Sequence, residues 1–106
     1  MKPLLDVLVI LDALDKEGSF AAAAGKLYKT PSALSYTVHK LESDLNITLL
    51  DRSGHRATFT PTGHLLLERG REVLHTVRQL EKQAVKLHQG WENELRIGVD
   101  DTFPFS

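Results

Sequence analysis

Apolar residues recur at helical spacing from the start of the chain. The first helix is predicted over residues 3–16 from apolar positions three or four apart: Leu4, Val7, Leu8, Leu11 and Leu14. Leu5, Val9 and Ile10 widen this stripe beyond one face, so we expect the helix to pack against more than one neighbour, a second chain included. Gly18 ends this helix, and Ser19 is placed to cap a short second helix, FAAAAGKL.

The next segment, TPSALSYTVHKLE, predicts a third helix with two different faces. Thr30 is its expected N-cap and Pro31 its first residue, so the proline starts the helix. The arc expected to face the core holds Leu34, Val38, Leu41 and Leu45. The opposite arc and its flanks hold Ser32, Ser35, Tyr36, His39, Lys40 and Ser43. Acids are absent there until Glu42, and the hydroxyls, imidazole and ammonium can donate to phosphates and base edges.

The second and third predicted helices form a helix-turn-helix across a tight turn at residues 28–29. In this motif the second helix enters the major groove of DNA with its N-terminal end. The following stretch, ITLLDRSGHRATFT, predicts two short strands around a turn at residues 53–54. Arg52 and Arg56 bracket the tip of this wing, where they are placed for phosphate or minor-groove contact.

A long helix is predicted from Pro61, with Thr60 as its cap, to about Gln89, before Gly90. Steps of four and three residues along it mark a heptad stripe: Leu66, Gly70, Val73, Val77, Leu80, Ala84 and Leu87. One small domain cannot bury this stripe, so we expect a two-fold dimer. Its contacts would come from all of these residues except Gly70. The alternative is a helix lying along its own domain. The later segment ELRIGV predicts a strand without a partner, so we expect a truncated second domain.

Composition and charge exclude several classes of function. The chain of 106 residues carries a formal net charge of −1, so it is not strongly basic, although its middle has more cations than acids. It has no cysteine, and its five histidines are not spaced like zinc ligands, so we expect no metal and no cofactor. The longest apolar run is interrupted by aspartate and is too short to span a bilayer. We therefore expect a cytoplasmic protein without membrane contact.

Five features are together highly specific in their order and spacing. They are GSFAAAAGKL, TPSALSYTVHKLE, LLDR with TPTG, the long helix and LRIG. With them the sequence resembles the N-terminal part of LysR-type transcriptional regulators over nearly its whole length. The resemblance implies a mainly α fold. Residues 1–60 would form a winged helix-turn-helix of three helices and a two-stranded wing, residues 61–90 a linker and dimerisation helix, and residues 91–106 the hinge and first strand of a truncated effector-binding domain.

The resemblance also implies the partners. These are double-stranded promoter DNA with an inverted repeat, a second copy of the chain through the linker helix, and a tetramer in the full-length protein. A small-molecule effector would bind only to the missing C-terminal domain.

We therefore predict sequence-specific binding to double-stranded DNA, with the recognition helix 31–44 in the major groove. The family's base-contacting positions carry over to Pro31, Ser32, Ser35 and Tyr36. The full set of predicted DNA contacts is Ser19, Lys29, Thr30, Pro31, Ser32, Ser35, Tyr36, His39, Lys40, Arg52 and Arg56. Many relatives have Gln-Pro where Pro31-Ser32 stands and Arg where Tyr36 stands, so their base preference does not carry over.

Two other classes of function compete with this interpretation. A protein-interaction module would use the heptad helix to recruit a partner and the helix-turn-helix only as a scaffold. Retention on heparin at low salt separates this alternative from a DNA-binding module. An enzyme is not expected, because no nucleophile stands with a base and an acid at usable spacing and no glycine-rich phosphate loop follows a strand.

Overall fold

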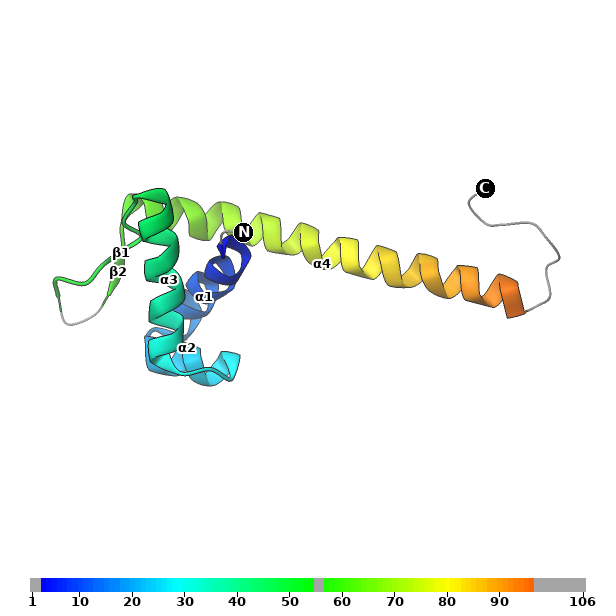
Figure 1. Cartoon of the computed structure of the whole chain (residues 1–106), viewed down its shortest axis with the longest axis horizontal. Coiled ribbons are helices and arrows are strands. Elements are labelled where there is room, and N and C mark those ends of the chain that lie inside the picture. Colours follow the sequence, from blue (N-terminus) through cyan, green and yellow to red (C-terminus); the bar gives the residue numbers. More distant parts are fainter. Residues whose placement is uncertain (1–2, 55–56, 97–106) are drawn as a thin grey trace. The chain divides into compact units, whose positions relative to one another are not determined.

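The computed structural model describes residues 3–54 and 57–96 of the chain. Its elements in order are α1 (Leu4–Glu17), α2 (Phe20–Leu27), α3 (Pro31–Leu45), β1 (Leu50–Asp51), β2 (Thr58–Phe59) and α4 (Pro61–Arg96) (Figure 1). The predicted fold class is confirmed: three helices are followed by a two-stranded antiparallel wing and a long helix. The chain divides into two units, one ending at Leu74 and the other starting at His75.

Local signals in the sequence begin and end the first three helices. α1 ends at Gly18, whose φ of 91° is left-handed and suits glycine. Ser19 caps α2 and Thr30 caps α3, each accepting a hydrogen bond from the amide three residues on, at 3.1 and 3.2 Å. Pro31 is the first residue of α3. These predictions are confirmed, because each depends on residues that are close in the sequence.

One apolar core joins α1, α2 and α3 to the first strand of the wing. Its largest fully buried side chains are Leu11, Leu34, Leu41, Leu49, Val7 and Val38. Leu45 was predicted to join this core but is 40% exposed. It is the last residue of α3, and the chain turns away at Asn46, whose φ of 55° is left-handed.

The hairpin is fastened to the start of α4 by Thr60. Its hydroxyl donates to the carbonyl of Thr48 at 2.6 Å and accepts from the amide of Gly63 at 3.0 Å, which agrees with the predicted cap. Gly63 is buried, and a Cβ added there would lie 2.1 Å from the carbonyl oxygen of Leu49. Only glycine allows the backbones to approach this closely.

α4 is longer than the sequence predicts. It was expected to end before Gly90, but it continues to Arg96. Glycine in a helix interior costs only about 1 kcal/mol relative to alanine, so a single glycine does not end a long helix. The expected boundary at residues 90–91 therefore falls inside α4. Leu95 and Arg96 are helical and not part of a strand, and residues 97–106, with the rest of the predicted strand, lie outside the described residues.

Candidate nucleic-acid interface

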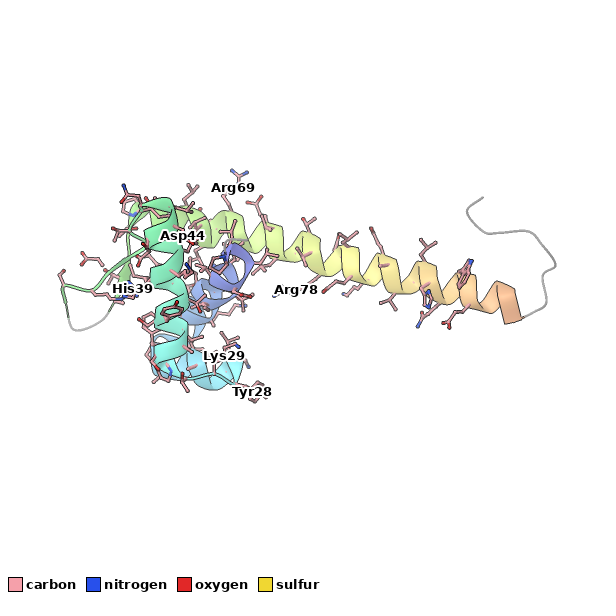
Figure 2. The ribbon with its side chains drawn as sticks, in the orientation of Figure 1. Tyr28, Lys29, His39, Asp44, Arg69 and Arg78 are labelled. Atoms are coloured by element: carbon pink, nitrogen blue, oxygen red, sulfur yellow. The ribbon has the colours of Figure 1, made fainter. Side chains whose placement is uncertain are left out.

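Two exposed side chains, Tyr28 and Lys29, lie at the C-terminal end of α2, in the turn that leads to α3 (Figure 2). Tyr28 closes α2 with a left-handed backbone at φ 58°, and the residue is 96% exposed. The amide of Lys29 donates to the carbonyl of Ala24 at 2.9 Å, while the Lys29 side chain is exposed. The turn therefore holds a cation next to Thr30, where α3 begins.

The outer face of α3 is polar, and it carries no acid between Ser32 and Lys40. Ser32 is exposed, Ser35 is half-buried, and Tyr36 is 67% exposed. The Nζ atom of Lys40 lies 3.7 Å from the carboxylate of Asp44, a long pair at the surface that contributes little to stability. This exposure agrees with the predicted interface, and the DNA contacts themselves stay predictions.

The hydroxyls that cap α2 and α3 lie at exposed helix N-termini, where a phosphate can approach them. A hydroxyl has one donor and two acceptor lone pairs, and Ser19 uses a lone pair to accept from a backbone amide. Thr30 does the same, and its Oγ1 also lies 3.4 Å from the hydroxyl of Ser32. The helix N-termini behind these caps carry partial positive charge, which favours a phosphate there.

The wing is a short antiparallel pair in which Leu50 lies opposite Phe59. In its turn, Asp51 accepts hydrogen bonds from the hydroxyl of Ser53 at 2.7 Å and from the Ser53 amide at 3.0 Å. The hydroxyl first, and then the amide, lowers the pKa of the Asp51 carboxyl. Arg56 lies outside the described residues, so its predicted DNA contact stays a prediction.

Arg52 does not extend from the wing as a free cation. Its Nη1 atom lies 2.5 Å from Nε2 of His39 and 4.0 Å from Oε1 of Glu42. Its guanidinium carbon lies 5.6 Å from the centre of the Phe20 ring, which is within the range of a cation–π interaction. The guanidinium thus faces α2 and α3, and the predicted contact of Arg52 with a phosphate or the minor groove stays a prediction.

Glu42 is the residue that the sequence analysis missed. Its side chain is only 11% exposed, and its Oε2 atom accepts from the amides of Leu49 at 2.7 Å and Leu50 at 3.3 Å. Its Oε1 atom lies 3.3 Å from Nδ1 of His39. The spacing to His39 is visible in the sequence, but the two amides lie beyond the turn at Asn46, where helical periodicity no longer applies.

The predicted dimerisation stripe of α4 divides between two environments. Leu66 is half-buried and packs against the core, and a Cβ at Gly70 would lie 2.6 Å from the side chain of Leu8. At these two positions α4 packs on its own domain, and the role of Leu66 in dimerisation stays a prediction. Val77 is half-buried. The exposed members are Val73, Leu80, Ala84 and Leu87, of which Leu80 is 63% and Leu87 64% exposed.

Residues 3–54 and 57–96 contain neither a metal-binding cluster nor a membrane-spanning helix. Within them, no group of three or more histidine, aspartate or glutamate side chains is arranged to hold a metal ion. None of the helices there is long and apolar enough to cross a membrane.

Comparison with known families gives a match over the helix-turn-helix and the wing. Residues 5–64 match the family model of bacterial regulatory helix-turn-helix proteins, lysR family. The chain is 87% identical over 106 residues to the uncharacterized HTH-type transcriptional regulator YeeY of Escherichia coli (strain K12), covering all of this chain and 34% of that protein. It is 50% identical over 100 residues to the probable HTH-type transcriptional regulator YhaJ of the same strain, covering 94% of this chain and 34% of that protein. The chain thus spans about a third of the length of these relatives.

Solved structures show the same architecture. The BenM DNA-binding domain in its complex with catB site 1 DNA superposes with a TM-score of 0.75 at 31% sequence identity, covering 81% of this chain and 92% of that one. The CbnR DNA-binding domain in its DNA complex superposes with a TM-score of 0.71 at 27% identity, covering 79% of this chain and 97% of that one.

Proposed function

Because the chain belongs to the LysR family of bacterial regulatory helix-turn-helix proteins, we propose that it binds double-stranded DNA sequence-specifically as a homodimer. The observation that carries this proposal is the outer face of α3, which is exposed, polar and without acids from Ser32 to Lys40. The DNA in the BenM and CbnR complexes supports it, since those domains share this fold. A regulator of this kind would act in the cytoplasm, and we expect no catalytic activity, because the curated relatives are transcriptional regulators.

Affinity would come mainly from groups that meet phosphates. Lys29 in the turn and Lys40 on α3 supply exposed ammonium groups, and the pair of Lys40 with Asp44 is loose enough to exchange for a phosphate. The hydroxyls of Ser19 and Thr30 supply donors in front of helix N-termini. Arg56 would add a contact from the wing to the DNA backbone or the minor groove. These contacts would fix the register of the protein on the duplex without reading its sequence.

Specificity would come from the first two turns of α3. Pro31 and Ser32 stand at its N-terminal end, which enters the major groove first in this motif. Tyr36 has a largely exposed ring with a hydroxyl that donates and accepts, and Ser35 lies on the same side of the helix, half-buried. Hydroxyl groups pair with several base edges, so the base preference has to be measured for this chain.

Dimerisation would use the exposed stripe of α4. Val73, Leu80, Ala84 and Leu87 leave apolar surface open, and a second copy related by a two-fold axis can cover it. A dimer would place two recognition helices on an inverted repeat. In the longer protein we expect tetramers and a small-molecule effector bound to a further domain.

The proposal can be tested by fluorescence anisotropy. The chain would be titrated against a duplex enriched from a random-sequence pool and against a scrambled duplex of equal length, at several salt concentrations. We expect tighter binding to the enriched duplex and a steep decrease of affinity with salt. Equal binding to both duplexes would contradict specific recognition, and no binding even at low salt would favour the protein-interaction alternative.

A further inference from the structure

Four side chains from α2, α3 and the residue that follows β1 meet on the inner side of the wing. They are Phe20, His39, Glu42 and Arg52, and we refer to them as the Arg52 cluster. Glu42 also accepts hydrogen bonds from two backbone amides at the start of β1. The cluster therefore joins the recognition helix to the first strand of the wing.

The donors and acceptors of the cluster assign the ring nitrogens of His39. Arginine has only donors, and the Nη1 atom of Arg52 lies 2.5 Å from Nε2 and 3.4 Å from Nδ1 of His39, so the closer Nε2 atom is assigned as the acceptor. The Glu42 carboxylate has only acceptors, and its Oε1 atom lies 3.3 Å from the His39 Nδ1 atom, so the proton is assigned to Nδ1. Both ring nitrogens are thus used within the chain, which leaves His39 no polar atom for a base edge.

The burial and charge of Arg52 indicate that its guanidinium is also used within the chain. Its side chain is 31% exposed, and its Nη2 atom is buried without a hydrogen-bond partner among the described residues. The positive charge has a carboxylate within 4.0 Å and an aromatic ring beside it. A cation that is already offset in this way releases no counterion when the protein meets DNA.

We propose that Arg52 and Glu42 are positioning residues that hold the wing against the recognition helix and fix the imidazole of His39. Neither Arg52 nor His39 then contacts a phosphate or reads a base. This assignment rests on the proposed DNA binding, and it removes both residues from the predicted contacts. Base reading falls to the N-terminal half of α3.

The salt dependence of binding separates a positioning arginine from one that contacts a phosphate. Arg52→Gln, Arg52→Lys and the control Lys29→Gln would be titrated on the enriched duplex at several salt concentrations. Lys29→Gln should reduce the slope of log K against log salt by about 0.9, the value for one phosphate. Arg52→Gln should weaken binding by the same factor at every salt concentration and leave the slope unchanged. Arg52→Lys should not restore affinity, because an ammonium lacks the planar group that faces both His39 and Phe20. A reduced slope for Arg52→Gln, or recovery with Arg52→Lys, would overturn the assignment.

Base preference tests the role of His39. Each base pair of the enriched half-site would be replaced in turn, and binding compared for wild type, His39→Ala and Tyr36→Ala. Tyr36→Ala should relax discrimination at one position, whereas His39→Ala should leave the pattern of preferences unchanged. Relaxation at a single position in His39→Ala would show that His39 reads a base.

A measurement without DNA keeps the cluster testable if a variant does not fold or if DNA binding itself fails. In the free wild-type chain, ¹⁵N NMR of the histidine side chains reports which ring nitrogen carries the proton. We expect the Nδ1–H tautomer for His39. Observation of the Nε2–H tautomer would overturn the assignment of the cluster. If the Nδ1–H tautomer is present but the wild-type chain binds no duplex, the result counts only against the proposed function.

Discussion

The Nε atom of Arg71 donates to the Oδ1 atom of Asp12 at 2.7 Å, and this contact joins the first part of α4 to α1. The same guanidinium donates through Nη2 to Asp15, also at 2.7 Å. The hydrogen bonds that Arg71 donates to Asp12 and then to Asp15 raise the pKa of Arg71. One arginine thus links α4 to carboxylates that are three residues apart on α1.

Loss of this link should lower stability modestly. We expect Arg71→Ala to reduce the free energy of unfolding by about 1 kcal/mol. Partly exposed ion pairs contribute little in general, and those with short, charge-assisted hydrogen bonds contribute the most stability. Arg69→Ala is the matched control, since Arg69 is 72% exposed and lies 3.8 Å from Glu72. Urea unfolding would measure both variants. Equal effects would mean that the link to α1 contributes nothing beyond an ordinary surface pair.

The same contact predicts a dependence of stability on pH. Burial raises the pKa of the Asp12 carboxyl, but the hydrogen bonds from Arg71 and Lys16 outweigh this effect, so the net pKa lies below the ordinary value of 3.8. A carboxyl with a lowered pKa in the folded state stabilises the fold above its unfolded pKa and loses this contribution as the pH falls through its folded pKa. In urea unfolding, the difference between wild type and Asp12→Asn should be constant near neutral pH and decrease below about pH 4. A difference that does not change with pH would contradict an ionic role for Asp12.

Three glycine-to-alanine substitutions should change the stability of the fold by different amounts. Gly63→Ala places its Cβ against a backbone carbonyl, which cannot move aside, and should cost about 2 kcal/mol or more. Gly70→Ala meets the buried side chain of Leu8, which can shift more easily than a backbone carbonyl, and alanine favours the helix, so this variant should cost less than Gly63→Ala. Gly25→Ala meets nothing within 4 Å and should stabilise the fold by up to about 1 kcal/mol. Thermal unfolding would give the order, and a tolerated Gly63→Ala would refute the close approach of the wing to α4.

Capping and DNA binding can be separated at Ser19. Aspartate and asparagine cap helices as well as serine does, so Ser19→Asp and Ser19→Asn should both keep the thermal stability of wild type. Ser19→Asp should weaken DNA binding at least about tenfold, because like charges in contact cost several kcal/mol. Ser19→Asn, which is neutral, should weaken it much less. Equal affinities for the two variants would place Ser19 away from the phosphates.

The exposed stripe of α4 predicts how the oligomer responds to a charge. Leu80→Glu should shift the chain toward monomer in sedimentation velocity, because a carboxylate replaces an apolar contact in the proposed interface. Gln79→Glu places the same charge one residue away on the exposed surface and should leave the dimer intact. Two variants with the same sedimentation behaviour would exclude the stripe as the interface.

Features that depend on neighbours in the sequence could be predicted, and features that depend on distant residues could not. Ser19, Thr30 and Pro31 begin their helices through bonds within one helical turn, so the pattern alone identified them. The inward turn of Arg52 depends on partners in α2 and α3, which no local pattern reveals. Gly90 resembled a helix end, but α4 continues through it to Arg96. A sequence shows where a helix is weakened, but not whether the weakening is large enough to end the helix.

The close approach of Gly63 to the wing also has an evolutionary consequence. This position is constrained by folding alone, since any side chain would meet the Leu49 carbonyl whatever DNA the protein reads. Tyr36 projects into solvent, so it can change with the operator at little cost to the fold. Among homologous regulators that diverge to control different genes, residue 63 should therefore stay glycine while residue 36 varies, and their operators should change with it.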